Sequence, residues 1–476
     1  MPSRRDQVQS YQFAVQRAVS AMVAGEADPL RSPLRRLVGA AFGSIMVGVI
    51  ALAAVGLFGL VTGRTGAGWR DGGSVILERE SGAAYVLRDG VLVPTANFTS
   101  ALLLQQSPST VTVPRKQLAG QPRAPMVGIP NAPESLPDPT RLLTGPWSLC
   151  TAGARTASGG QSATTALFVG TAAPGGRVLS DQEALLVKLP GGDTLYLVWH
   201  GYRYRINSAD VVLEALALTQ QPQVAVGGSW LNALPEGTAI APLTQDGRGE
   251  PFRALPDMPD ARVGQILVVE TADKKQYYLV GRERLRPITP VEAAVALADP
   301  QTRRAYSNNA PQARELAAGA ALAAPRAEAP AASAERPPDT PPRIARLSGT
   351  EATMCATFAG NESVARVFVD AEPFTGQGVP TERRTQRGAS LVDRVVVAPG
   401  HGAVVAAQSS PSAQLGTLFL VTDLGVRYPL SSPDVLRMLG YPDAEPVRLP
   451  AGLVARLPEG PELDPEAAAE PVQPID

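Results

Sequence analysis

The sequence predicts an α+β protein with a single N-terminal transmembrane helix, followed by an elongated region. In that region we expect a central disulfide-linked β domain flanked by four small ββα repeat domains. Three observations lead to this fold class: a long uncharged apolar run near the N-terminus, a strand–turn–strand–helix pattern that occurs four times, and two cysteines that both follow the apolar run.

Length and composition limit the possible classes of protein. With 476 residues the chain is too long for one ordinary domain, and 44% apolar against 18% charged residues is typical of a globular protein. The net charge of -1 argues against nucleic-acid binding, which needs a basic excess. Arginine supplies nearly all of the positive charge, because lysine occurs only at Lys116, Lys188, Lys274 and Lys275.

The first 36 residues form a short arm before the apolar run. Within this arm Val8, Tyr11 and Val15 recur near helical spacing, which predicts an amphipathic helix. Such a helix beside a membrane either lies on anionic headgroups or docks onto a cytoplasmic or membrane partner. The residues of the arm leave both hypotheses open.

Residues 37–61 contain no charged side chain, and about 20 apolar residues suffice to cross a bilayer. A cleaved signal peptide would have a shorter apolar region and a small-x-small cleavage site, which the following TGRTGAGW does not supply. We therefore expect an uncleaved transmembrane helix over 37–61.

Arginines flank the apolar run on its N-terminal side. Arg31, Arg35 and Arg36 stand immediately before it, and positive charge marks the cytoplasmic flank of a membrane span. The N-terminus is therefore predicted to be cytoplasmic, with the rest of the chain on the extracytoplasmic, periplasmic side of the cell (inner) membrane.

Cys150 and Cys355 are the two cysteines, and both follow the span. An oxidising compartment and an even count favour a disulfide between them over two separate buried thiols. A bridge across about 200 residues contributes roughly 5 kcal/mol in the chain-entropy model, as an upper value. It would join residues 140–180 and 346–402 as the two parts of one central β domain.

The recurring pattern predicts four repeat domains, at residues 74–138, 183–245, 262–317 and 403–460. In each copy an aromatic residue of the second strand precedes a proline or arginine by nine or ten positions; these aromatics are Tyr85, Tyr196, Tyr278 and Phe419. A helix follows, and Thr289 with Glu292 forms a capping box in the third copy. Ser208 or Asn207 and Ser432 are the expected caps of the second and fourth helices.

Two segments have the composition of flexible chain. Residues 318–343 are rich in alanine and proline without apolar periodicity, which predicts an exposed flexible linker. Residues 461–476 resemble it and are predicted to form an acidic flexible tail.

No catalytic, cofactor-binding or metal-binding residue is predicted. The sequence contains neither a GxxxxGK[ST] loop nor a GxSxG elbow. The two histidines, His200 and His401, have no ligand partners at metal-binding spacing, and we expect both in turns or at the surface.

Several stretches together resemble the EccB family, the membrane core component of actinobacterial type VII (ESX) secretion systems. They are SRRDQVQSYQFAVQRAVSAMV, the basic PLRSPLRR, PRKQLAGQPRAPMVGIPNAPESLP, GPWSLC, APGHGAVV and LPAGLVARLPEGPELD. The resemblance covers nearly the whole chain and is weakest in the Ala/Pro-rich segment.

The resemblance implies a structural core subunit of the secretion membrane complex that supports protein export and self-associates. The implied partners are an EccC-type motor ATPase, an EccD-type many-span subunit, an EccE-type subunit and a mycosin-like protease. It favours partner docking by the arm, for which we expect the residues Arg4, Arg5, Val8, Tyr11, Phe13, Val15 and Arg17.

Two alternative functions stay open at this point. The family is sometimes labelled an ATPase, so an extracytoplasmic nucleotide hydrolase with ATP as its cofactor is one alternative, although no nucleotide motif supports it. Small repeats in an extracytoplasmic protein also suggest a cell-wall-binding module.

Overall fold

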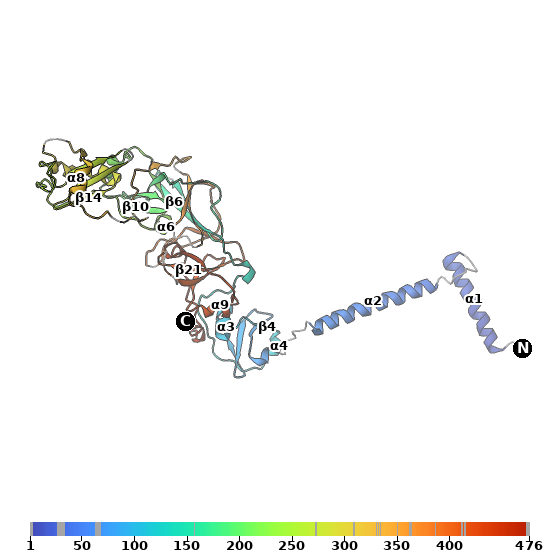
Figure 1. Ribbon diagram of the computed structural model, residues 1–476. Coiled ribbons are helices and arrows are strands. Elements are labelled where there is room, and N and C mark those ends of the chain that lie inside the picture. The colour runs from blue at the N-terminus through green and yellow to red at the C-terminus, as the bar shows by residue number, and fades with distance from the viewer. Residues whose placement is uncertain are drawn as a thin grey trace. The chain divides into compact units, whose positions relative to one another are not determined.

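In the computed structural model the chain forms two compact units, Met1–Asp71 and Gly72–Asp476 (Figure 1). The structure describes residues 3–25, 34–61, 68–156, 158–271, 274–307, 310–329, 331, 333, 335–349, 351–360, 364–385, 387–410, 413 and 416–472.

The first unit is helical. Helix α1 (Arg4–Ala24) begins with a capping box between Ser3 and Asp6, followed in the chain by α2 (Leu34–Val61) and the 3₁₀ turn η1 (Gly68–Asp71). The predicted span 37–61 falls within α2, where the side chains of residues 37, 38 and 56–61 lie outside the described part. Among the described residues, no helix is both long and apolar enough to cross a membrane.

The second unit opens with a sheet that illustrates a recurring arrangement. Three antiparallel strands, and not the two that were predicted, are followed by a helix, and a fourth strand then pairs in parallel with the first strand. The elements are β1 (Val75–Glu78), β2 (Ala84–Arg88), β3 (Val91–Pro94), α3 (Phe98–Gln105) and β4 (Thr110–Val113). Asn97 caps α3 by accepting a hydrogen bond from the Ser100 backbone N–H at 2.8 Å.

The strand order of the first sheet is β3-β2-β1-β4. Within the described residues three further sheets contain the equivalent order, and these are β10-β9-β8-β11, β14-β13-β12-β15 and β23-β22-β21-β24. The second comprises β8 (Glu183–Lys188), β9 (Leu195–Trp199), β10 (Tyr202–Arg205), α5 (Ala209–Ala215) and β11 (Val224–Ala225). The third comprises β12 (Ile266–Glu270), β13 (Lys275–Val280), β14 (Leu285–Ile288), α7 (Pro290–Ala298) and β15 (Arg314–Glu315). The fourth comprises β21 (Ala403–Gln408), β22 (Thr417–Val421), β23 (Arg427–Pro429), α9 (Asp434–Met438) and β24 (Val447–Pro450).

The helix caps agree only in part with the sequence. The capping box of Thr289 and Glu292 is present on α7. Ser208 precedes α5 in a left-handed conformation, and its side chain makes no hydrogen bond that caps the helix. Helix α9 follows Pro433, which takes the cap position in place of the expected Ser432. Both of those helices are short, and buried residues such as Val212 and Val435 attach them to the core.

A short helix and a closing segment follow the fourth strand of each sheet. The helices are α4 (Arg115–Leu118), α6 (Gly228–Ala233), α8 (Ala318–Ala323) and α10 (Ala451–Val454). After each helix the chain bridges to the third strand in parallel, through Leu92↔Arg123, Arg203↔Glu236, Leu285↔Arg326 and Arg427↔Glu459.

The predicted linker 318–343 is therefore wrong in its first part. Ala321 and Ala324 are buried in the core of the third sheet, and the Leu285 N–H donates to the Pro325 carbonyl at 2.8 Å. Alanine shows little apolar periodicity in the sequence, yet its small side chain fits closely against a strand.

A central sheet joins two distant parts of the chain. Its strand order is β19-β20-β6-β5-β17-β18-β7, with β5 (Trp147–Arg155) at the centre and β17 (Thr353–Phe358) next to it. The others are β6 (Gln161–Phe168), β7 (Arg177–Val178), β18 (Arg366–Ala371), β19 (Val379–Pro380) and β20 (Arg394–Val396). Strand β16 (Arg343–Ile344) pairs with β8 of the second sheet.

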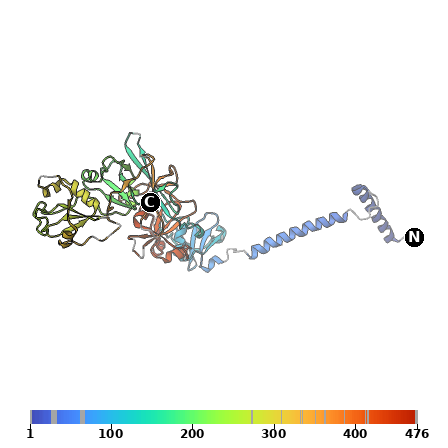
Figure 2. The same cartoon turned by 45° about the horizontal axis from the view of Figure 1, so that its top comes forward.

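Shared apolar cores connect these sheets. Helix α3 packs on α9, α5 on α7, and α6 on α10, so the first sheet adjoins the fourth and the second adjoins both the third and the fourth (Figure 2). The largest core combines residues of the central, second and fourth sheets, with Trp147 and Trp230 fully buried.

The predicted acidic tail 461–476 is wrong over residues 461–472. Leu463 and Ala468 are fully buried, and the turn η4 (Ala467–Ala469) lies against α3. The Gly128 N–H donates to the Glu470 carbonyl at 3.0 Å, and the Val472 N–H donates to the Met126 carbonyl at 3.0 Å. Residues 473–476 lie outside the described part.

Candidate functional site

The predicted disulfide between Cys150 and Cys355 is present, with an S–S distance of 2.04 Å. The two residues face each other in the antiparallel register of β5 and β17, and both are fully buried. Phe168 and Phe374 pack around them. The bridge joins the two parts of the central sheet at its middle and has a structural role.

The seven residues predicted to dock a partner lie on α1, but they do not share one face. Val8, Tyr11 and Val15 recur at helical spacing and are exposed. Phe13 lies about 140° around the helix axis from Val8. The Arg17 guanidinium stacks 5.7 Å from the centre of the Phe13 ring, so these two residues form a separate patch.

The arginines predicted to flank the membrane cannot be placed as side chains. Arg31 lies outside the described residues, and Arg35 and Arg36 belong to α2, where the structure does not describe their side chains. The predicted orientation of the span therefore stays a prediction.

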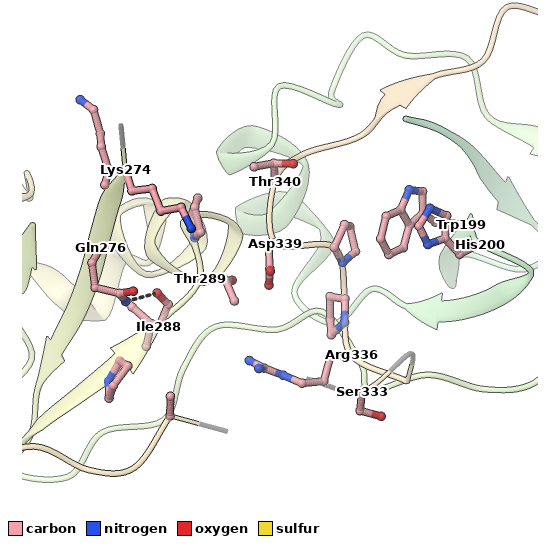
Figure 3. Close-up of a pocket in the computed structure, with 16 residues that line it drawn as sticks. Trp199, His200, Lys274, Gln276, Ile288, Thr289, Ser333, Arg336, Asp339 and Thr340 are labelled. Carbon is pink, nitrogen blue, oxygen red and sulfur yellow. Dashed lines mark hydrogen bonds between the residues drawn. The ribbon is translucent and has the colours of Figure 1, made fainter. Parts of the chain in front are cut away.

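A hollow of about 750 Å³ lies between the second and third sheets. It was not anticipated from the sequence. Its lining comes from the β9–β10 turn, from β13, from the end of β14 and from the strap, by which we mean residues 335–340 (Figure 3). The lining residues used below are Trp199, His200, Lys274, Lys275, Gln276, Thr289, Arg336, Asp339 and Thr340.

An aromatic pair forms one side of this hollow. The rings of Trp199 and His200 stack with centroids 3.5 Å apart and planes 14° from parallel. The Trp199 indole N–H donates to the Asp181 carbonyl at 2.9 Å, which fixes the ring. His200 is exposed in the turn, as predicted, with a backbone φ of 49°.

Cationic side chains gather on the other side. The Lys275 ammonium lies 2.5 Å from a Glu270 carboxylate oxygen, and this hydrogen bond raises the pKa of Lys275 above its ordinary value. No partner of the Lys274 ammonium occurs among the described residues. Arg336 on the strap lies 3.6 Å from Glu292 and points into the hollow.

Sequence reasoning missed this hollow because its residues come from four separate segments. The available signal was the rarity of the residue types: two of the chain's four lysines and one of its two histidines line it. In the described part of the chain, no three His, Cys, Asp or Glu side chains are placed to hold a metal ion.

The architecture defines a protein built from several small mixed sheets around a disulfide-linked central sheet, preceded by two helices. The chain belongs to the family described as "Type VII secretion system ESX-1, transport TM domain B", whose model matches residues 1–472. This match establishes the EccB resemblance seen in the sequence.

The chain is similar to two relatives over most of its own length and of theirs. "ESX-3 secretion system ATPase EccB3" of Mycolicibacterium smegmatis is 29% identical, covering 96% of this chain and 89% of the relative. "ESX-5 secretion system ATPase EccB5" of Mycobacterium tuberculosis is 28% identical, covering 97% and 92%.

Solved structures give the same result. A chain of "Structure of an intact ESX-5 inner membrane complex" matches with a TM-score of 0.62 and 26% identity, covering 100% of this chain and 97% of that one. A chain of "Structure of EccB3 dimer from the ESX-3 core complex" matches with a TM-score of 0.60 and 25% identity, covering 83% and 100%.

Proposed function

We propose that this chain is a structural core subunit of a type VII secretion membrane complex and supports protein export. The observation that carries the proposal is the match over residues 1–472, together with full coverage of the chain by a component of an intact ESX-5 inner membrane complex. The similarity thus includes the N-terminal arm as well as the sheets.

The proposed topology places α1 in the cytoplasm, residues 37–61 in the membrane and the sheets outside, on the periplasmic side. The uncharged run, the preceding arginines and a buried disulfide support this arrangement, because such bridges persist in oxidising compartments. We further infer that the four sheets of equal strand order correspond to the four predicted repeat domains.

The proposed partners are those of the family: an EccC-type motor ATPase, EccD-type and EccE-type subunits, a mycosin-like protease and a second copy of this chain. The similarity to a chain of an EccB3 dimer supports self-association. We expect no cofactor for this role. An ATPase activity is tested separately, by measuring phosphate release from ATP by the purified full chain.

The exposed apolar face of α1 allows a direct test of docking. We expect Val8→Asp combined with Val15→Asp to remove the chain from the large complex, because charges on this face prevent apolar packing. Gln9→Asp combined with Gln16→Asp is the matched control at exposed polar positions and should retain assembly, and Phe13→Asp tests the separate Phe13–Arg17 patch. Native gels of mildly solubilised membranes, with mass spectrometry of the band, measure the outcome.

Two results would count against the proposal. If the wild-type chain migrates alone, the role as a core subunit is wrong. If the variant with Val8→Asp and Val15→Asp assembles normally while Phe13→Asp does not, docking uses the Phe13–Arg17 patch instead.

A further inference from the structure

The hollow between the second and third sheets contains residue types that are scarce in this chain. Lys274 and Lys275 are two of four lysines, and His200 is one of two histidines. Trp147 and Trp230 are fully buried in the core, whereas Trp199 is half-buried beside the hollow. Folding thus places an accessible aromatic pair and flexible cations around one space.

We propose that this hollow binds an anionic saccharide, a short chain of sugar rings that carry acidic groups. The C–H faces of sugar rings pack on flat aromatic surfaces such as the Trp199 and His200 pair. Lysine ammonium groups reach flexibly towards acidic groups and form charge-assisted hydrogen bonds with them. Neither the fold nor the family match assigns a ligand to this space.

Two of the three cations that line the hollow are neutralised by carboxylates next to them. The cations are Lys274, Lys275 and Arg336, and the Asp339 carboxylate also lines the space. Glu270 and Glu292 lie next to Lys275 and Arg336, while the Lys274 ammonium has no partner in the part of the chain that the structure describes. Lys274 is therefore the cation best placed to meet a ligand.

The hydrogen-bonding groups favour a sugar over a peptide. An extended peptide gains most of its affinity by adding to a free strand edge. Here β14 is paired with β13 on one side and bridged at Arg326 on the other. The strap is also occupied, since the Val291 N–H donates to the Asp339 carbonyl at 3.2 Å.

Side chains supply the remaining polar groups. Gln276, Thr289, Thr340 and Asp339 line the same space with amide, hydroxyl and carboxylate groups, and the Gln276 amide nitrogen already donates to the Tyr277 carbonyl at 2.8 Å (Figure 3). Sugar hydroxyls both donate and accept hydrogen bonds, so they can use this mixed set. In Figure 3 the strap lies between the aromatic pair and Lys274, so a ligand of several rings must pass over the strap to contact both.

The test uses the full chain in a detergent without a sugar headgroup. The probes are a hyaluronan tetrasaccharide, neutral chitotetraose and tetraglutamate, followed by Trp fluorescence and calorimetry. We expect the hyaluronan tetrasaccharide to bind, and chitotetraose to bind at least about tenfold more weakly. Tetraglutamate should also bind at least about tenfold more weakly.

The variants locate the site. Lys274→Glu with Lys275→Glu should weaken hyaluronan binding by at least about tenfold, while Lys116→Glu, at an exposed lysine on α4, should leave it unchanged. Trp199→Phe should abolish the fluorescence change. Circular dichroism confirms that each variant is folded.

The proposal is overturned if no saccharide binds at about 10 mM, a concentration that detects even weak ligands. It also fails if tetraglutamate binds as tightly as hyaluronan, since the hollow would then be an acidic-peptide site. Equal weakening by Lys116→Glu, or a fluorescence change that persists in Trp199→Phe, would place the binding elsewhere.

Discussion

At the residue scale, the two cysteines connect segments separated by 205 positions. Their side chains are fully buried between apolar neighbours, so the bridge lies within the core and not at the surface. Without it, the unfolded chain would gain the freedom of that long loop.

We predict that replacing both cysteines, Cys150→Ala with Cys355→Ala, destabilises the central sheet by about 2–5 kcal/mol. Thermal unfolding followed by circular dichroism measures the change. A reductant should lower the melting temperature of the wild type and leave that of the variant unchanged. Equal melting temperatures of the two proteins would show that the bridge contributes little.

Glu78 is a nearly buried carboxylate, and its oxygen lies 2.5 Å from the Arg115 guanidinium. The Arg115 hydrogen bond holds the pKa of the Glu78 carboxyl below its ordinary value of 4.5. A carboxyl whose pKa is lower in the folded state than in the unfolded state stabilises the fold above the unfolded pKa. That stabilisation is lost as the pH falls through the folded pKa.

We therefore predict that Glu78→Gln lowers the melting temperature at neutral pH, and that its difference from the wild type shrinks as the pH falls below about 4.5. Melting curves of both proteins between neutral and acidic pH measure this. A difference that stays constant with pH would exclude the ion pair as its cause.

At the scale of elements, the closing segment of each sheet packs against the third strand. In the second sheet Gly237 lies against Tyr204, and a β-carbon at this position would come within 2.2 Å of the tyrosine ring. Gly460 meets Tyr428 in the same way in the fourth sheet, at 2.3 Å. Glycine is required here for close approach and not for a turn.

We predict that Gly237→Ala destabilises the protein by about 1–3 kcal/mol, because the added methyl group cannot be accommodated. Gly319→Ala is the control: it adds the same methyl group in helix α8 with nothing within 4 Å. It should be neutral or stabilise the protein by up to about 1 kcal/mol. Melting temperatures of the two variants compare them, and equal shifts would refute the steric explanation.

At the scale of the whole second unit, the chain's last described segment returns to its first sheet. Leu463 and Ala468 are buried in the core that the first and fourth sheets share. Residues close to the C-terminus thus belong to the same apolar core as Val75 on the first strand of the first sheet.

We predict that truncation after Gly460 destabilises this core by about 2–5 kcal/mol, the usual cost of removing one large buried apolar side chain. Truncation after Val472 is the matched control and should leave stability unchanged. Limited proteolysis of the first sheet and thermal unfolding provide the measurement. Equal behaviour of both truncations would mean that the tail packs without contributing to stability.

The sequence by itself determined the two cysteines as partners and the family. These properties depend on local periodicity and on residue identity, which can be read along the chain. The sequence predicted two strands before each helix, whereas the structure has three, because the third strand is only three or four residues long. Ser3 with Asp6 on α1 and Thr289 with Glu292 on α7 likewise follow local rules, and only the second box was predicted.

Only the tertiary structure determined that residues 318–326 and 461–472 pack against the sheets. It alone revealed the hollow at Trp199 and Lys274. Alanine, proline and glutamate give these segments a composition that is typical of flexible chain. Composition does not show which distant residues pack against a segment. Burial depends on surfaces that other strands supply from far away in the sequence. The hollow exists only because the second and third sheets pack together through α5 and α7.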